Sequence, residues 1–599
     1  MEKLLFKHRI FFSIVFCSLF LCHVNTFAQV TISGKIVDNI NKIGLSYVSL
    51  QIENSHFGTI SNEEGSFILT IPDTIVNKHI SFSCIGYKKA TKSINEILAD
   101  NIIGLDTVAY SLNEVEIAYY NENVLINLIQ SAIKKRRNQN SGETQAKCLI
   151  KILTSDGNNP VELIEALGQG FLNPIDGLTG IRLKTGRAAY SYSTSEKFFN
   201  LDFTKTLSGL SIFKKYPSKQ LFPLSVCNLS KAKVKKNYSF SVKEIQEYHS
   251  EEVMTIRCLV KTTTANYLNV DLSIGFNTQE IYSVTSYGYV SNNLLFTPLY
   301  EDHKIDSIYI KTTAVYKNHP DDLPSLKYLL IDYSLNYDDM QSIRKINSKM
   351  LVNLFDYQSA FYLSNAKFND EDNDYTKLKF LHFDSVFWAR NYFSAESNLE
   401  KEFKAYFSKN GSMINYDKSF CFNYLPEIDY PYIVWNQKQL NWTDLNTVPI
   451  DIAQSPNKSS SYKDRQFNSN LYNLDFQIYM DIYKTNNTTK VFSETVFSKN
   501  GSAYYLEKNN EAIEFINLYF DIYESTRNTI SERIMSLKNV SVSTIDSVYN
   551  AEMNNLNLLI EDYRKEVNRG NDLSGMKKWS DLIQKNLSKP PQEIVIIND

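Results

Sequence analysis

The chain has 599 residues, of which 43% are hydrophobic and 22% are charged, and its formal net charge is −3. These values are close to those of folded soluble proteins and exclude a wholly disordered, collagen-like or polytopic membrane protein. At about 100–200 residues per domain, the length predicts three to five domains.

The first 28 residues are typical of a secretory signal. They begin with three basic side chains, Lys3, Lys7 and Arg9. The apolar stretch over 10–24 is too short to span a bilayer, and the small side chain of Ala28 favours cleavage before Gln29. We therefore expect an exported protein. An uncleaved anchor and a lipoprotein modified at Cys22 are the alternatives.

The charge pattern argues against a nucleic-acid partner. Loss of Glu2 and the three basic residues with the signal changes the net charge from −3 to −5, which is not the profile of a nucleic-acid-binding protein. The basic run over 134–137 ends a predicted helix, where cations suit the helix dipole. We expect this run to be a solvated helix end.

The cysteines do not form a recognisable framework. Five remain after the signal, namely Cys84, Cys148, Cys227, Cys258 and Cys421. An odd, widely spaced set without C-x-x-C is not a disulfide scaffold, so we expect most of these side chains to be buried as small apolar groups. One disulfide between two of these cysteines remains possible, and the sequence does not specify which two.

Residues 30–118 predict a β-sandwich. Apolar and polar residues alternate over 30–37, and short strand-like runs with turn residues between them follow at close spacing. Gly65 stands in an Asn/Glu/Gly turn, where we expect a positive φ. About seven short strands in about 90 residues have the size and rhythm of a sandwich.

The motifs of this segment resemble the carboxypeptidase-like regulatory domain. They occur in the order 34–38 (GKIVD), 47–48 (YV), 58–67 (GTISNEEGSF) and 85–87 (IGY). The resemblance covers about 15% of the chain and implies a transthyretin-like module that is common in Bacteroidetes-type cell-envelope proteins. It also implies a structural or interaction role without catalytic residues, because the active site of true metallocarboxypeptidases lies in a different domain.

The middle of the chain predicts one helix and a large sheet. Asn123 can cap a helix over 124–137, and the alternation of apolar and polar residues over 268–274 is typical of a strand. Successive strands over 145–340 have short connections, which favours an antiparallel meander. At fold level such a sheet resembles the half-barrel of periplasmic lipoprotein carriers. We expect its concave, polar or aromatic face to bind the ligand.

The last part predicts a short mixed segment and then helices. Ser397 and Glu400 form a capping box, and Trp435 and Trp442 lie in a Tyr- and Pro-rich stretch. Aromatic side chains of this kind can stack on sugars, although ordinary packing is the preferred interpretation. Beyond 470, apolar residues recur at helical spacing, with the first apolar face interrupted at Arg527. We expect Ser543 and Asp546 to open the second helix, in a C-terminal bundle.

The fold class expected from these patterns is α+β multidomain, with a transthyretin-like β-sandwich, a central antiparallel β-sheet domain with flanking helices, and a C-terminal helical unit. The predicted boundaries are 1–28 for the signal peptide, 29–118 for the regulatory sandwich, 119–345 for the helix and antiparallel meander, 346–454 for a mixed α/β extension, 455–470 for a linker, and 471–599 for a mainly helical domain.

Two patterns could indicate a metal site. His249-Ser250-Glu251-Glu252 matches the H-x-x-E spacing of a zinc carboxypeptidase, but no second-ligand context accompanies it. Asp370-Glu371-Asp372 could bind calcium, but it lacks a regular ligand spacing, so we expect a solvated loop. The sequence contains no H-E-x-x-H, G-x-S-x-G, Walker A or G-x-G-x-x-G motif. We therefore predict no catalytic, metal or cofactor-binding residue and no cofactor.

These observations together predict an exported, non-catalytic cell-envelope protein that acts in binding or assembly. Its place would be the periplasm, the periplasmic face of an outer membrane or the cell surface. The expected partner is an envelope protein, a glycan or a lipid, and any association with a membrane is peripheral. The alternatives are a zinc-dependent carboxypeptidase-like hydrolase and a component of an outer-membrane nutrient uptake system.

Overall fold

The computed structural model divides into two compact units, described here one at a time. The first lies within Met1–Ala109, Glu247–His249 and Phe393–Ser397, and the second contains the rest of the chain. The residues that the structure describes are 29–55, 57–72, 75–108, 121–139, 142–173, 175, 177–191, 202–215, 223–248, 251–262, 267–290, 296, 302–317, 325–416, 430–435, 439–447, 472–484, 488–505, 508–537, 540–587 and 592–597.

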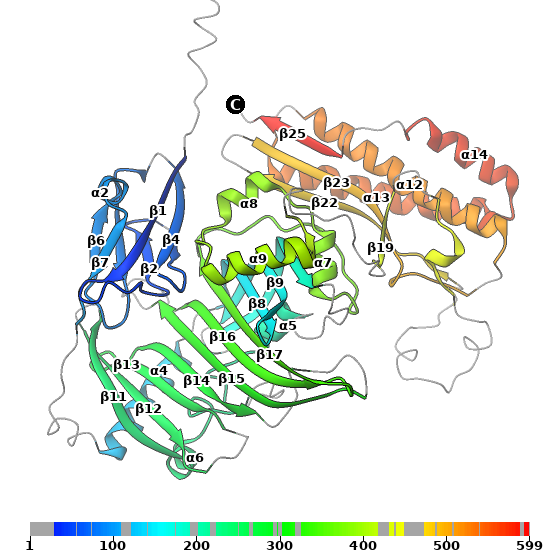
Figure 1. The fold of residues 1–599 in the computed structure, drawn as a ribbon. Coiled ribbons are helices and arrows are strands. Elements are labelled where there is room, and N and C mark those ends of the chain that lie inside the picture. Colours follow the sequence, from blue (N-terminus) through cyan, green and yellow to red (C-terminus); the bar gives the residue numbers. More distant parts are fainter. Residues whose placement is uncertain are drawn as a thin grey trace, which may run out of the picture. The chain divides into compact units, whose positions relative to one another are not determined.

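The first unit is built from two sheets, in the orders β4-β1-β7 and β3-β2-β5-β6 (Figure 1). Alternate residues of β1 and β4, such as Ile32 and Leu69, pair across the first sheet and are buried. Gly65 has a φ of 81° in the turn before β4, as predicted. The elements are β1 (Gln29–Asp38), β2 (Ser49–Ile52), β3 (Gly58–Ile60), β4 (Ser66–Pro72), β5 (His79–Ser83), β6 (Ala90–Ser93), α2 (Ile94–Ala99) and β7 (Ile102–Leu105). This arrangement agrees with the predicted N-terminal sandwich.

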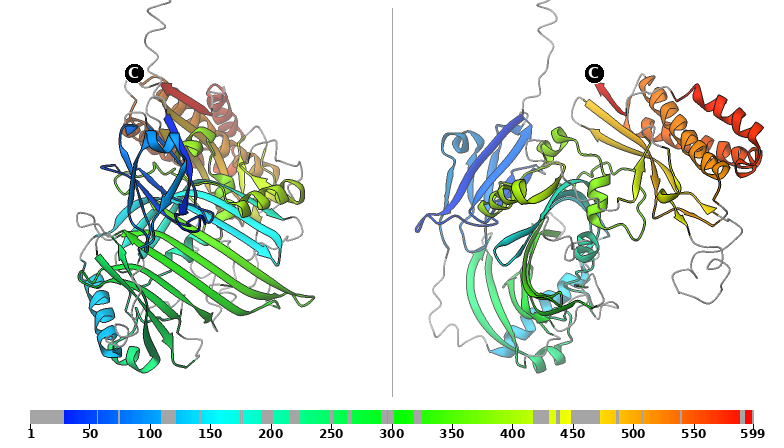
Figure 2. Two further views of the ribbon diagram at one scale, coloured as in Figure 1. Left: turned by 60° about the vertical axis from the view of Figure 1, so that its left-hand side comes forward. Right: turned by 45° about the vertical axis from the view of Figure 1, so that its right-hand side comes forward.

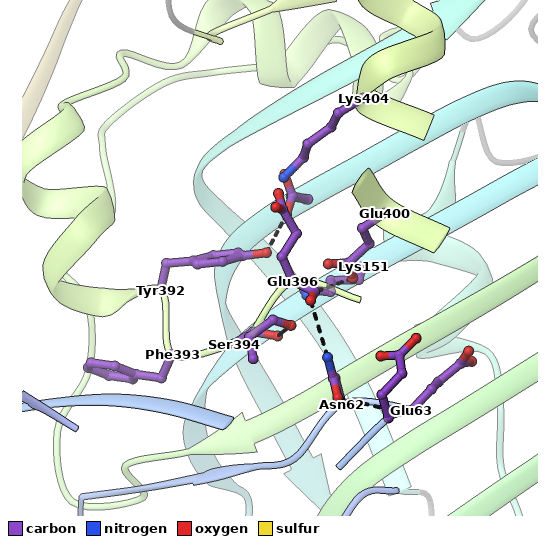
Figure 3. Close-up of polar contacts among 12 residues, drawn as sticks. Asn62, Glu63, Lys151, Tyr392, Phe393, Ser394, Glu396, Glu400 and Lys404 are labelled. Carbon is purple, nitrogen blue, oxygen red and sulfur yellow. Dashed lines mark hydrogen bonds and ion pairs between the residues drawn. The ribbon is translucent and has the colours of Figure 1, made fainter. Parts of the chain in front are cut away.

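Two stretches from later in the chain belong to the first unit. One of them, Phe393–Ser397, is the connection between two helices of the second unit. The Thr59 hydroxyl donates to the backbone carbonyl of Phe393 at 2.6 Å, and the Asn62 side-chain amide donates to that of Glu396 at 3.2 Å (Figure 3). The module is therefore completed by residues more than 300 positions away.

The second unit contains the predicted antiparallel sheet. Its order is β11-β12-β13-β14-β15-β16-β17-β8-β9-β10-β18, so the meander from β11 to β17 is followed by the earlier strands β8 to β10. The strands are β8 (Thr144–Asp156), β9 (Asn159–Asn173), β10 (Gly177–Ser191), β11 (Tyr238–Tyr248), β12 (Glu251–Val260), β13 (Asn269–Gly275), β14 (Ile281–Val290), β15 (Lys304–Lys317), β16 (Ser325–Asp338), β17 (Ile343–Phe355) and β18 (Gly411–Ile414).

The sheet curves around the predicted helix, α4 (Glu122–Asn138) (Figures 1 and 2). The helix starts at Asn121, whose side chain accepts from the backbone N–H of Asn123 and Val124, two residues before the predicted cap. Its buried face packs against the apolar face of the sheet together with side chains of α5 (Phe203–Ser208) and α6 (Lys231–Asn237).

The basic end of α4 is solvated only in part: Lys134 and Lys135 are exposed, as predicted, but Arg136 and Arg137 are not. Arg136 is buried, and its guanidinium lies over the ring of Tyr316 at 4.4 Å from the centroid. Arg137 donates to the backbone carbonyls of Phe213 and Cys227, both at 2.7 Å. A guanidinium can satisfy carbonyls and aromatic faces inside a core, which a charge count along the sequence does not reveal.

The rest of the second unit consists of short helices followed by a small sheet, against which the helices α12, α13 and α14 are arranged. The small sheet has the order β19-β23-β22, with β25 also paired to β23. The elements are α7 (Asp374–Phe380), α8 (Ser385–Asn391), α9 (Asn398–Asn410), β19 (Tyr432–Val434), η3 (Trp442–Asp444), β20 (Asn446–Thr447), β21 (Tyr472–Asn473), β22 (Phe476–Lys484), β23 (Thr488–Ser498), β24 (Ala503–Tyr504), α12 (Asn510–Met535), α13 (Val542–Glu566), η4 (Asn568–Gly570), α14 (Leu573–Gln584) and β25 (Glu593–Ile597). None of the helices described is long and apolar enough to cross a membrane.

The C-terminal helices occur as predicted, with one local difference. Ser541, not Ser543, caps α13, and it forms a capping box with Thr544. Arg527 interrupts the apolar face of α12 because it is a buried ion-pair partner: its Nη2 donates to Glu524 at 2.8 Å. The proposed linker over 455–470 lies outside the described residues.

Candidate functional site

The two faces of the central sheet differ in chemistry. The concave face, toward α4, carries aliphatic side chains such as Leu272, Ile310 and Val352 and forms the main core. The expectation of a polar or aromatic ligand surface on the concave face is therefore wrong. Strand alternation specifies which residues share a face, but it does not specify which way the sheet curves. The polar residues lie on the opposite, outer face.

Hydroxyl groups form a hydrogen-bonded row on the outer face of β12, β13 and β14. The hydroxyls of Thr255 and Ser273 are 3.0 Å apart, and that of Ser283 donates to Ser273 at 2.9 Å. Thr285 and Thr313 form a second pair at 3.1 Å between β14 and β15. These cross-strand pairs satisfy one another and fix the register of the polar face.

An ion-pair cluster lies beside the first hydroxyl row. Arg257 binds the Asp271 carboxylate through two N–H groups, both at 3.0 Å, and Lys243 of β11 reaches it at 3.2 Å. Burial alone would raise the pKa of Asp271, but the hydrogen bonds from Arg257 and Lys243 hold it below its ordinary value. The carboxylate is thus fully engaged by its neighbours.

Tyrosines on β14 and β15 complete the outer face. Tyr289 is 67% exposed, and its ring meets that of Tyr309 edge to face at a centroid distance of 5.3 Å. The exposed Lys311 pairs with Tyr287 across the same two strands. An aromatic pair with one exposed ring beside polar groups can contact the flat face of a sugar or the side chains of a protein. We name Tyr287, Tyr289, Tyr309, Lys311 and Thr313 the outer β14–β15 surface.

A buried charge network covers the outer face of β8, β9 and β10. Arg187 Nε donates to Glu165 at 2.6 Å, and Lys404 of α9 approaches the same carboxylate at 3.3 Å. Tyr392, which Figure 3 labels together with Lys404, and Tyr416 also donate to Glu165. Burial would raise the pKa of Glu165, but the charges of the two cations hold it far below its ordinary value. The network therefore joins α9 to the sheet.

A second buried pair joins β10 to β22. Lys184 binds Asp481, and it also donates to the backbone carbonyl of Ile482 at 3.0 Å. The ammonium lies 3.9 Å from the ring centroid of Tyr483. Burial lowers the pKa of Lys184 and raises that of Asp481, because each charge has left water. The pair is saturated by contacts within the fold.

The residues of the two metal hypotheses do not assemble into one site. His249 lies outside the described residues, and Glu251 accepts hydrogen bonds from Thr278 and Tyr282. In the described ranges no three His, Cys, Asp or Glu side chains could hold a metal ion together. The expected solvated loop at 370–372 is only partly solvated, because Asp372 is buried and accepts from the Tyr432 hydroxyl.

The described cysteines and tryptophans act as packing residues. Cys148, Cys227 and Cys258 are buried, as expected, and these three and Cys84 form no disulfide among the described residues, while Cys421 falls outside the described ranges. Trp435 donates to Asp521 at 2.8 Å, and Trp442 also packs on the C-terminal core. This agrees with packing and not with a sugar platform at these two rings.

His382 is the group near the C-terminal sheet whose protonation we expect to affect stability. Its ring stacks on Phe492 at a centroid distance of 3.8 Å, and burial lowers its pKa to about 4. Glu593 and Asp384 oppose this shift, whereas Lys184 and Lys490 add to it. The folded protein therefore keeps this imidazole neutral to unusually low pH.

Acidification from pH 7 to pH 5 should weaken the folded state through His382. The unfolded chain takes up the proton near pH 6.5 and the folded chain only near pH 4, so stability is complete above pH 6.5 and is lost as the pH falls. Because 22% of the side chain is exposed, we expect a loss of about 1 kcal/mol by pH 5.

The measurement compares chemical unfolding at the two pH values for the wild type, His382→Gln and the exposed control His79→Gln. The comparison between variants is needed because Glu494 on β23 has a pKa raised to about 7 by burial, which gives the opposite slope. A His382→Gln slope equal to that of the wild type would contradict the assignment.

Comparison with protein families identifies the N-terminal module. Residues 32–117 match the family model described as the CarboxypepD_reg-like domain. This confirms the resemblance that the motifs between Gly34 and Tyr87 indicate. The match covers a small part of the chain and does not extend to the central sheet or the C-terminal helices. A comparison with curated proteins gave no match.

Solved structures similar to part of the chain include three bacterial proteins. The LolA superfamily protein NE2245 from Nitrosomonas europaea has 12% identity and a TM-score of 0.16, and the match covers 38% of this chain and 94% of that one. A putative outer membrane lipoprotein-sorting protein domain from Vibrio parahaemolyticus has 9% identity, a TM-score of 0.18, and coverages of 40% and 93%. The MucA/MucB complex of Pseudomonas aeruginosa has 6% identity, a TM-score of 0.13, and coverages of 38% and 93%. TM-scores this low support no conclusion about function.

Proposed function

We propose that the protein is an exported, non-catalytic component of the cell envelope that binds another envelope component through the outer β14–β15 surface. The partner is an envelope protein, or a glycan or lipid headgroup of the envelope. The observation that carries the proposal is the ring pair formed by the exposed Tyr289 and the half-buried Tyr309, which lies on a sheet face whose neighbouring hydroxyls and charges already satisfy one another.

The export part of the proposal is supported by the signal-like first 28 residues. The non-catalytic part is supported by the way the most perturbed ionisable groups are used. Glu165 and Asp481 are each bound by cations of neighbouring elements, so their shifted pKa values follow from packing. A carboxylate held in this way connects structural elements, and it has no open side at which a substrate could bind.

Loss of the two tyrosine rings should abolish partner binding. A photo-cross-linking residue at Lys311 would capture the partner in intact cells, and Tyr289→Ala with Tyr309→Ala should reduce the cross-linked product at least tenfold, as expected for central aromatic contacts. Leu573→Ala is the control, because Leu573 is also 67% exposed but lies on α14. Equal cross-linking by the double variant and the wild type would contradict the proposed surface.

Cell fractionation tests the location separately from the surface. We expect the chain in the envelope fraction with Gln29 at its N-terminus. Recovery in the cytoplasm with an intact N-terminus would end the proposal. Stoichiometric zinc in the purified protein, together with a peptidase activity that is lost in His249→Ala, would instead favour the hydrolase alternative.

A further inference from the structure

Helix α6 (Lys231–Asn237) carries a concentration of positive charge that neither the fold nor the outer β14–β15 surface explains. Four of its seven residues are lysines with exposed side chains, namely Lys231, Lys233, Lys235 and Lys236. The helix has one buried side chain, Val234, which anchors it to the main core. The lysines are therefore not needed to hold the helix in place.

The contacts of two of these lysines are with neutral groups. Lys231 Nζ donates to the Asn127 side chain at 2.7 Å, and Lys235 Nζ approaches that of Asn123 at 3.4 Å. Lys261 adds a fifth cation, because its Nζ donates to the backbone carbonyl of Lys235 at 3.2 Å. We name Lys231, Lys233, Lys235, Lys236 and Lys261 the α6 surface.

Among the described residues, four of the five lysines in this surface lack the carboxylate partner that other lysines of the chain have. Within the described ranges Lys231, Lys235, Lys236 and Lys261 form no ion pair, and neither does Glu122 in the first turn of α4. By contrast, Lys135 at the other end of α4 contacts Glu280 at 2.6 Å. A patch of like charge in a chain of net charge −3 costs folding energy through self-repulsion, which an anionic partner would relieve.

We propose that the α6 surface holds the protein on an anionic phospholipid membrane surface. Clustered lysines beside a membrane are attracted by its negative surface potential, and each adds to the binding. Lysine heads are mobile point charges without the planar fork of arginine, so they suit laterally mobile headgroups better than one rigid ligand. The proposal does not rest on the outer β14–β15 surface.

Vesicle co-sedimentation tests the proposal. The protein without its predicted signal is mixed with phosphatidylglycerol or phosphatidylcholine vesicles at low salt and at about 0.5 M salt. The variant replaces Lys231, Lys233, Lys235 and Lys236 by Gln. The control replaces the same number of exposed lysines elsewhere by Gln, namely Lys401, Lys409, Lys565 and Lys577. Thermal unfolding checks that both are folded.

We expect the wild type and the control to bind phosphatidylglycerol vesicles at low salt and to be released by high salt. The α6 variant should bind at least tenfold more weakly. Equal binding by the variant and the control, equal binding to phosphatidylcholine, or no binding to either vesicle would overturn the proposal. Release from the vesicles by soluble polygalacturonate, added at a small excess of negative charge over that of the lipid, would also overturn the proposal and would favour an acidic glycan as the partner.

Discussion

Replacing Glu165 by Gln should destabilise the central sheet by about 3–5 kcal/mol, one of the two largest effects that we expect for a single substitution in this chain. The carboxylate is fully buried and neutralises Arg187 and Lys404. Glutamine keeps the size of the side chain but removes the charge, so two cations that keep less than a fifth of their side-chain exposure lose the negative charge that Glu165 supplies. The cost arises from the loss of this buried charge more than from the lost hydrogen bonds.

Urea unfolding followed by tryptophan fluorescence measures this effect, because Trp388 lies 5.0 Å from the Arg187 guanidinium. Glu402→Gln is the matched control: the residue is on the same helix as Lys404 but is exposed, and we expect less than about 0.5 kcal/mol. A Glu165→Gln midpoint within error of the control would show that the network contributes little.

Replacing Lys184 by Met should cost a similar amount, about 3–5 kcal/mol, because it leaves Asp481 charged and buried between β10 and β22. Methionine fills most of the lysine stem, so packing against Tyr483 is largely kept and the measured loss reports the charge. The separation of 297 residues means that the pair joins the central sheet to the C-terminal sheet.

The double variant Lys184→Met with Asp481→Leu separates the two explanations of that loss. Removal of both charges leaves no uncompensated ion, so we expect the double variant to be more stable than Lys184→Met alone and close to the wild type. The coupling is obtained from a double-mutant cycle in urea. Losses that simply add would mean that the two side chains act independently, contrary to their direct contact.

The parts of the fold predicted from sequence are those encoded by neighbouring residues. Alternation over 268–274 is sufficient to recognise β13, and the apolar spacing between Leu125 and Ile133 is sufficient to recognise α4. Both patterns arise because the polypeptide itself sets the periods of two and 3.6 residues. The regulatory module was predicted from the order of its turn and strand motifs, and the family match confirms it.

The buried charge networks and the buried end of α4 could not be predicted from the sequence, because their parts meet only in the folded chain. Lys151 and Glu400 are separated by 249 residues, and each looks like an ordinary surface charge in the sequence. Its three basic neighbours in the sequence predict that Arg136 is solvated. In the folded helix its side chain is instead buried against the ring of Tyr316. The curvature of the sheet, which decides whether the polar face is inside or outside, depends on all eleven strands together.

The contribution of Phe393–Ser397 to the N-terminal module has a consequence for how the protein is made. During synthesis, the segment that contains Thr59 and Asn62 is made long before the carbonyls of Phe393 and Glu396 that accept their hydrogen bonds. The N-terminal module therefore lacks these two acceptors until about two thirds of the chain has been synthesised. A fragment that ends at 118 lacks these acceptor carbonyls, so we do not expect it to behave as an independent domain.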